Sequence, residues 1–210
     1  MEAAQLLIQK GHQIVLEARS LDRADQMFRT LPQADAVVVG DLMSIAGTRR
    51  IAEQVNGLGA FDAAIHNAGV GYREPKRIAP EDGLPHVLAV NTIAPYILTV
   101  LISRAQRLVC LSSILHQKMD PSLKDLTCRK RPWQGEQAYT DTKLPVVLLD
   151  FAVARCWPGV LSNALEPGLE RTKMGGGGRR MISMRRIAPK SDSLQAMMRR
   201  QWYRTNISTT

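Results

Sequence analysis

The chain of 210 residues is poor in aromatic side chains and in cysteine. Aromatic residues make up 5% of it, and its three cysteines, Cys110, Cys128 and Cys156, are odd in number and far apart. They form no Cys-x-x-Cys pair and have no histidine nearby at the spacing of zinc ligands. We therefore interpret them as structural or incidental thiols, and the sequence favours neither a disulfide framework nor a metal site.

The sequence also lacks a long apolar run. No stretch of 18 apolar residues occurs, so no membrane-spanning helix is predicted. The first ten residues, MEAAQLLIQK, contain neither a basic leader nor a signal-peptide cleavage site. With 45% apolar residues, a chain of this length can bury the core of one domain. We expect a soluble, cytoplasmic protein; its oligomeric state, a homo-oligomer included, is left open.

Acidic residues are scarce only at the carboxyl-terminal end. The formal net charge is +9, of which residues 179–210 hold +7, with seven arginines, one lysine and one aspartate, whereas residues 1–178 hold +2. A nucleic-acid interface is typically a basic face interleaved with aromatic residues, and this tail offers only Trp202 and Tyr203. We predict no specific nucleic-acid partner and expect a poorly ordered tail over 179–210.

Apolar runs with strand character alternate with helical patterns along residues 1–178. The predicted strands cover residues 12–19, 34–42, 61–69, 107–113 and 160–168, and the predicted helices cover residues 3–10, 44–59, 84–105 and 139–155. This alternation is typical of βαβ units, in which helices cover both faces of a parallel sheet. The sequence therefore predicts a doubly wound α/β fold, with the ends of its strands opening on one edge.

Four polar residues occur in an order that suits a carbonyl site. Tyr139 and Lys143 are four residues apart, so on a helix they lie one turn apart on the same face. An ammonium group beside a phenol favours the phenolate and brings its pKa toward a range useful for acid/base work. Ser113 ends the apolar run RLVCLSS, and Asn91 lies earlier, in VNTIAPY. The Tyr-x-x-x-Lys spacing alone is weak evidence.

The order of the surrounding segments makes the set specific. These segments are HNAG at 66–69, VNTIAPY at 90–96, CLSS at 110–113, YTDTK at 139–143 and EPGLERT at 166–172. Together they resemble the short-chain dehydrogenase/reductase family, over about residues 3–178, which implies a Rossmann-like domain and interconversion of a carbonyl and an alcohol. The resemblance implies that Tyr139 is the acid/base, that Ser113 polarises the carbonyl, and that Lys143 binds the nicotinamide ribose. Asn91 would order the proton relay.

The same resemblance implies a nicotinamide cofactor. Arg19 ends the first predicted strand, where an arginine suits a ribose 2′-phosphate, so NADP is favoured and NAD stays an alternative. Asp41 and Leu42 resemble the adenine-contact pair of the family. The remaining cofactor-binding residues that the resemblance implies, besides Tyr139 and Lys143, are Asn67, Ala68 and Gly69 at a strand end and Pro167, Gly168 and Thr172 near the carboxamide.

An interval of 25 residues, 114–138, separates Ser113 from Tyr139. Loops longer than about 12 to 15 residues are uncommon unless they are functional or disordered. The length resembles the family branch that includes retinol dehydrogenases and protochlorophyllide reductase, in which the insertion borders the substrate pocket. Trp133 is interpreted as pinning this segment to the core rather than stacking on a substrate. The substrate itself is not readable from the sequence.

Three features depart from the family pattern. The chain begins inside the first helix, so we expect the first strand and its glycine-rich phosphate turn to be lacking, which leaves edges unpaired or forces the neighbouring strands together. After about Gly178 the sequence diverges. In a back-translation with permitted codons, moving the reading frame back by one base can yield an acidic sequence without a stop codon, which suggests a frameshift. Pro145 is expected to weaken or kink the helix of Tyr139. A noncatalytic fragment with a lost pyrophosphate site is therefore the alternative function.

Overall fold

The computed structural model describes residues 1–119, 121–167 and 185–186, so most of the predicted basic tail lies outside the described residues. The strands are β1 (Val15–Ala18), β2 (Ala36–Val39), β3 (Ala63–His66), β4 (Arg107–Leu111), β5 (Leu161–Glu166) and β6 (Arg185–Arg186). The α-helices are α1 (Glu2–Gln9), α2 (Leu21–Thr30), α3 (Ile45–Leu58), α4 (His86–Leu88), α5 (Ala94–Leu101) and α6 (Gly135–Cys156). A π-helical segment, η1 (Ala89–Ile93), joins α4 to α5, and a 3₁₀ helix, η2 (Ile114–Lys118), follows β4.

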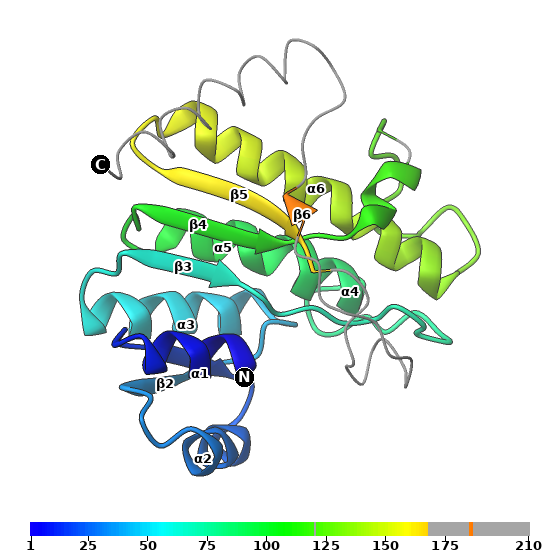
Figure 1. Cartoon of the computed structure of the whole chain (residues 1–210). Helices are drawn as coiled ribbons and strands as arrows, with labels where there is room; N and C mark the ends of the chain where they lie inside the picture. The colour runs from blue at the N-terminus through cyan, green and yellow to red at the C-terminus, as the bar shows by residue number, and fades with distance from the viewer. Residues whose placement is uncertain (120, 168–184, 187–210) are drawn as a thin grey trace.

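The strands form two sheets. In one, β1 pairs with β2 in parallel; in the other, the order is β3-β4-β5-β6, with β3, β4 and β5 parallel and the short β6 antiparallel to β5 (Figure 1). Within the described residues, β1 and β3 are not paired with each other. Of the two outcomes expected from the sequence, unpaired edges are therefore the one observed.

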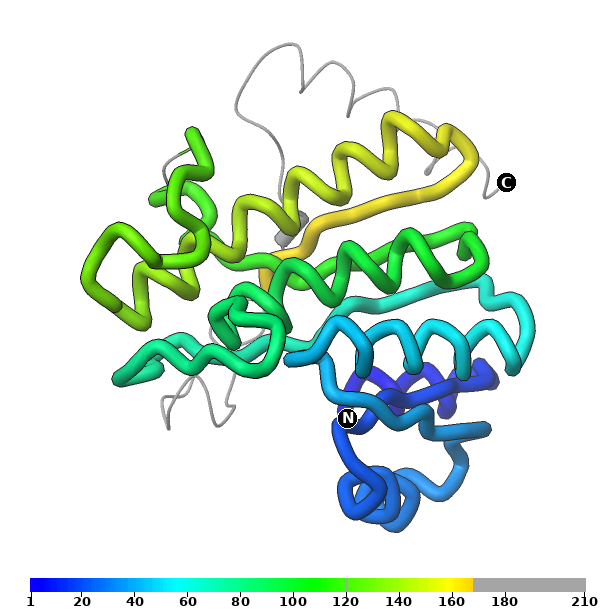
Figure 2. Tube along the Cα trace, turned by 180° about the vertical axis from the view of Figure 1, so that it is seen from behind, coloured from blue at the N-terminus to red at the C-terminus, as the bar shows by residue number. Residues whose placement is uncertain are grey.

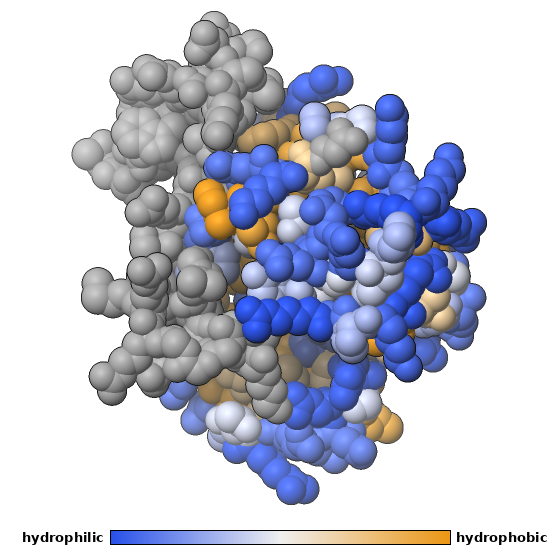
Figure 3. Space-filling model, turned by 90° about the vertical axis from the view of Figure 1, so that its right-hand side faces the viewer, coloured by the Kyte–Doolittle hydropathy of each residue, from blue (hydrophilic) through white to orange (hydrophobic). Residues whose placement is uncertain are grey.

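The carboxyl ends of the strands open on one side of the molecule. The arrows of β3, β4 and β5 point the same way in Figure 1. The loop after β2 reaches the same side, because the backbone N–H of Ile45 donates to Asp82 Oδ2 at 2.7 Å, and Asp82 belongs to the connection that follows β3. Figure 3 shows this side of the molecule, where the residues in view are mostly hydrophilic.

Helices lie on both faces of the strands, which confirms the predicted doubly wound α/β architecture. The two views place α1 on one face and α3 and α5, packed against each other, on the other (Figures 1 and 2). One apolar cluster joins Val38 to Ile51 and Ala52 of α3 and Leu98 of α5. A second joins α6, β4 and the residue before β5 through five buried residues: Leu108, Cys110, Val146, Val153 and Val160.

Three details differ from the expected elements. Helix α2 was not predicted; it begins after Ser20, whose hydroxyl accepts a hydrogen bond from the N–H of Arg23. The predicted helix over 84–105 is divided by the π-helical segment η1, a rare form that is frequent at functional sites. Helix α6 begins four residues before Tyr139 and runs unbroken through Pro145.

No helix in the described part of the chain is long and apolar enough to cross a membrane.

The α3 helix offers a matched test of the core. Ile51 is 2% exposed and lies in the cluster with Val38 and Leu98, whereas Leu58, in the last turn, is 51% exposed. We expect Ile51→Ala to lower the free energy of unfolding by about 2 to 5 kcal/mol, because it leaves a cavity. Leu58→Ala should change it by less than about 1 kcal/mol. Chemical denaturation of the two variants measures both values, and equal losses would contradict the assigned packing.

Candidate active site

The turn of α6 that carries Tyr139 and Lys143 is buried. Tyr139 is 9% exposed and Lys143 is 4% exposed, although both have polar ends. The Lys143 Nζ lies 5.0 Å from the centre of the Tyr139 ring, as their spacing of four residues on one helix predicts. The structure therefore brings the phenol and the ammonium together on one face of the helix.

Lys143 is held at the end of β4 by two hydrogen bonds. Its Nζ donates to the carbonyl oxygen of Leu111 at 3.2 Å, and its own carbonyl oxygen accepts from the Ser112 hydroxyl at 2.9 Å. Ser112 in turn donates its backbone N–H to Leu165 of β5 at 2.8 Å. Ser112 was not among the predicted site residues, yet it fixes the helix to the strand ends.

Asn91 lies in η1 and is 2% exposed. Its Oδ1 accepts from the N–H of Val70 at 2.9 Å, while its Nδ2 donates to the Val70 carbonyl at 3.0 Å and to Thr142 Oγ1 at 3.1 Å. The side chain thus joins the connection after β3 to the turn between Tyr139 and Lys143.

Ser113 caps η2. Its Oγ accepts from the N–H of Leu115 at 3.3 Å, and within the described residues its hydroxyl donates to no other group. The segment η2 packs against α6, so Ser113 belongs to the same group of elements as Tyr139. Its carbonyl oxygen lies 2.6 Å from Nδ1 of His116, which fixes the start of η2.

The pKa of Tyr139 moves opposite to the expected direction. Burial raises it to about 12, and the neighbouring Tyr72 adds to the increase. Burial also lowers the pKa of Lys143 to about 8. The expected lowering of the Tyr139 pKa is therefore not observed in this structure, because burial of the phenol disfavours its charged form.

Tyr72 was missed at the sequence level. Its ring meets that of Tyr139 edge to face, with centroids 5.4 Å apart, and the guanidinium of Arg73 lies 5.4 Å from the Tyr72 ring centre. Tyr72 follows the HNAG segment by three residues, and no spacing rule connects it to a position 67 residues later. Only the fold places it against the phenol.

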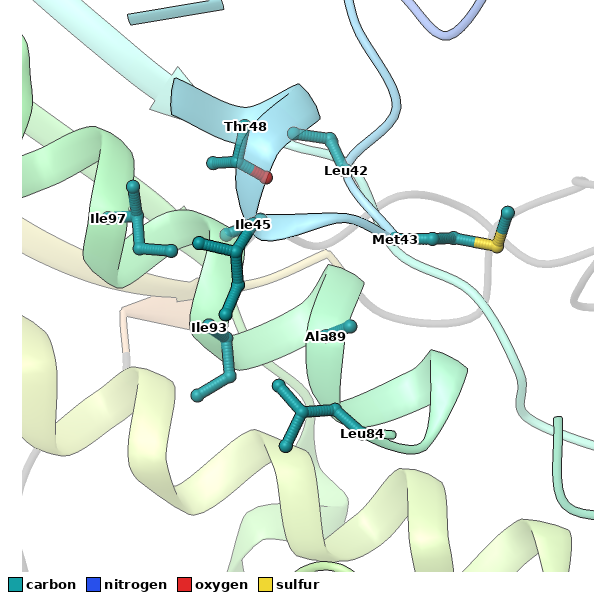
Figure 4. Close-up of a pocket in the computed structure, with 9 residues that line it drawn as sticks. Leu42, Met43, Ile45, Thr48, Leu84, Ala89, Ile93 and Ile97 are labelled. Carbon is teal, nitrogen blue, oxygen red and sulfur yellow. The ribbon is translucent and has the colours of Figure 1, made fainter. Parts of the chain in front are cut away.

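The predicted adenine-contact pair lies after β2. The Asp41 carboxylate accepts from the N–H of Met43 at 2.9 Å, and α3 passes so close that a side chain at Gly47 would collide with the Asp41 backbone. Leu42 borders a shallow apolar hollow, open to solvent, in which Thr48 carries the only hydroxyl group among the labelled side chains (Figure 4). This hollow is separate from the Tyr139 phenol.

The other predicted cofactor residues also stand at strand ends. Arg19 is exposed after β1, and Asn67 and Ala68 are exposed after β3, followed by Gly69. Pro167 follows β5 and is partly buried. Gly168 and Thr172 lie outside the described residues.

The interval between Ser113 and Tyr139 is fastened to the connection that follows β3. Trp133 donates its Nε1 hydrogen to the Glu74 carbonyl at 2.9 Å and packs on a cluster that includes Val87 and Ala138. Arg77 donates to the Thr127 carbonyl at 3.2 Å. The interpretation of Trp133 as a pin between this segment and the core is therefore confirmed.

A buried carboxyl group on α6 was also missed. Asp150 is 1% exposed, and its Oδ1 accepts from the Ser162 hydroxyl at 2.6 Å. Its Oδ2 is buried and has no hydrogen-bond partner among the residues that the structure describes. Burial raises the pKa of Asp150 to about 7, against the opposing effect of hydrogen bonds from Ser162 and Cys110. The sequence signal was weak, because an aspartate in a helix is usually exposed.

The family follows from the amino-terminal half. Residues 1–114 match the family model described as short chain dehydrogenase. This chain belongs to the short-chain dehydrogenase family. It is similar to the short-chain dehydrogenase chyC of Penicillium rubens, with 40% identity over 181 residues that cover 85% of this chain and 69% of that protein.

Two further similarities agree with membership of the short-chain dehydrogenase family. Human retinol dehydrogenase 13 is 30% identical over 183 residues, which cover 80% of this chain and 55% of that protein. The crystal structure of a blue fluorescent protein from a metagenomic library, in complex with NADPH, matches with a TM-score of 0.62 and 19% identity, covering 82% of this chain and 70% of that one. The latter likeness supports the fold.

Asp150 makes stability depend on pH. The native state keeps its proton up to about pH 7, whereas the unfolded chain releases it near pH 4. Between these values the unfolded state binds fewer protons, so stability falls as pH rises, by up to about 4 kcal/mol. Glu17, with a pKa raised to about 7 by burial and by Asp41, acts in the same direction.

Urea unfolding of the wild type and of Asp150→Asn between pH 4 and 8 isolates the contribution of this group. We expect a smaller decrease in the variant, because the amide does not titrate. The Glu17 contribution is common to both proteins and cancels in the difference. Parallel pH profiles would contradict a protonated Asp150 in the native state.

Proposed function

We propose that this short-chain dehydrogenase interconverts a carbonyl and an alcohol by hydride transfer, with Tyr139 as the acid/base. The observation that carries the proposal is the buried pairing of the phenol with Lys143, whose ammonium is fixed at the carboxyl end of β4. Family membership supports it, because the two named relatives are dehydrogenases. The substrate would be a small molecule.

In the reducing direction, Tyr139 gives its phenolic proton to the carbonyl oxygen while the carbonyl carbon accepts a hydride. With its pKa raised to about 12, the phenol is protonated at neutral pH and so holds the proton that the reduction needs, although a pKa this far above neutral pH makes it a weaker acid than an ordinary phenol. Ser113 donates its free hydroxyl proton to the same oxygen. Lys143, with a pKa lowered to about 8, can hold ribose hydroxyls, and Asn91 keeps the intervening turn in place and orders the relay.

A nicotinamide cofactor, NADP in preference to NAD, would supply the hydride. Three groups fit it: the exposed Arg19 after β1, the exposed residues Asn67 and Ala68 after β3, and Lys143 at the end of β4. An arginine binds a ribose 2′-phosphate through two charge-assisted hydrogen bonds. Asp41, Leu42, Gly69, Pro167, Gly168 and Thr172 complete the proposed set.

A noncatalytic member of the family is the second candidate. The observation that favours it is the pair of open strand edges, since β1 and β3 are not paired within the described residues. These strands precede Arg19 and Asn67, so the proposed cofactor groups stand on elements without a shared ladder of hydrogen bonds. Binding and turnover measurements separate the two candidates.

Tyr139→Phe tests the proposed acid/base. We expect it to lower kcat/KM for reduction of a ketone or aldehyde panel by about 100-fold or more, because it deletes only the hydroxyl. Tyr72→Phe is the matched control, since it removes the hydroxyl of the neighbouring ring and should stay within about threefold of the wild type. NADPH consumption followed by absorbance gives both values. A Tyr139→Phe enzyme within a few-fold of the wild type would reject this role.

Arg19→Ala tests cofactor choice. We expect NADPH to bind about 10- to 100-fold more weakly, because charge-assisted hydrogen bonds worth about 1.5 to 3 kcal/mol are lost. NADH binding should change by less than about twofold, since NADH has no 2′-phosphate. Titration calorimetry measures both. Equal losses for the two cofactors would argue against the 2′-phosphate contact, and no saturation of the wild type at millimolar cofactor would favour the noncatalytic candidate.

A further inference from the structure

The turn of α6 from Tyr139 to Lys143 is enclosed by three different parts of the chain. All five of its residues are at most 9% exposed. From the β4 side, Ser112 donates to the Lys143 carbonyl; from η1, Thr92 Oγ1 donates to the Thr142 carbonyl at 3.1 Å. The third side is occupied by the segment between Ser113 and Tyr139, through Arg131.

Arg131 contacts the side of α6 opposite to the phenol. Its Nη2 donates to Asp141 Oδ2, while Gln137 Nε2 donates to Asp141 Oδ1 at 2.7 Å. At 100° per residue, Asp141 lies about 200° around the helix from Tyr139. Arg131 therefore supports the turn from behind and does not border the carbonyl site from this position.

The contact between Arg131 and Asp141 lies where α6 lacks one of its backbone hydrogen bonds. Proline has no N–H, so Pro145 cannot donate to the carbonyl of Asp141, and its ring crowds that carbonyl. An interior proline costs a helix about 3 kcal/mol, yet α6 continues to Cys156. The residue that loses its helical backbone bond is thus the residue whose side chain Arg131 holds.

Arg131 is itself fixed in place. Asp125 lies 4.0 Å from its Nε and accepts hydrogen bonds from the N–H groups of Arg129 at 2.8 Å and Lys130 at 3.0 Å. Cys128 Sγ lies 3.3 Å from the Nη2 atom. An arginine fork held at two other points loses less side-chain freedom when it binds a carboxylate.

We propose that Arg131 is a positioning residue, which holds the Tyr139–Lys143 turn through Asp141 and offsets the backbone hydrogen bond that Pro145 removes. The importance of this turn for catalysis rests on the proposed function. The mechanical part of the proposal, that Arg131 stabilises this turn of α6, does not rest on the proposed function. If Arg131 offsets the hydrogen bond that Pro145 removes, its contribution to the stability of the turn should depend on whether residue 145 is proline.

Amide hydrogen exchange of the full chain tests the mechanical part. We expect Arg131→Ala to speed exchange over residues 139–146 by about tenfold or more, while Arg129→Ala, at an exposed neighbour, stays within about twofold. In a Pro145→Ala background, where the N–H is restored, the same Arg131→Ala change should speed exchange by less than about threefold. If Arg131→Ala does not fold, Arg131→Lys, which keeps the charge and loses the fork, replaces it with the same expected order of effects.

Turnover provides a second measurement. Arg131→Ala should lower kcat by about tenfold with KM changed by less than about twofold, and Pro145→Ala should restore most of the loss. Equal acceleration of exchange by Arg131→Ala in both backgrounds, or none in either, would overturn the proposal. A chain without turnover or NADPH binding would instead reject the proposed function, while the exchange measurement would still decide the role of Arg131.

Discussion

The candidate site depends on one seam, the packing of α6 against β4. Leu108 and Cys110 of β4 face Val146 and Val153 of α6, and this apolar contact brings Lys143 to the end of the strand. Two hydrogen bonds, from Lys143 Nζ to Leu111 and from Ser112 to the Lys143 carbonyl, then fix the register between helix and strand. The phenol of Tyr139, the cap at Ser113 and the contact with Asn91 are all positioned relative to this seam.

The same seam sets the electrostatics. Packing α6 tightly on the sheet removes water from Tyr139, Lys143 and Asp150. Because burial favours the uncharged form, it raises the pKa values of Tyr139 and Asp150 and lowers that of Lys143. Position and protonation are therefore not independent here. A helix that packed more loosely would leave the phenol more solvated, with a pKa closer to its ordinary value, but it would also lose the fixed distance between phenol and ammonium.

Residues linked by local spacing could be predicted from the sequence, and residues linked only by the fold could not. Tyr139 and Lys143 share a helix face by their interval, and apolar runs that end at Ser113 and Asn67 predicted the strand ends. Tyr72, Arg131 and Asp150 were missed because their partners come from distant segments or lie on another element. The direction of the Tyr139 pKa also required burial to be known, since the sequence shows the nearby charge but not the loss of water.

The two ends of the proposed cofactor site differ in how firmly they are built. The buried clusters join α3, α5 and α6 to the strands, whereas α1 has no buried residue and α2 has only Ala24. Ile65 of β3 is 47% exposed, as expected for a strand that is paired on one side and poorly covered on one face. Lys143 thus stands on the well-packed part and Arg19 on the part with fewer buried contacts. Because both residues would have to hold one cofactor at once, the proposed activity requires β1 to keep a fixed position relative to β3.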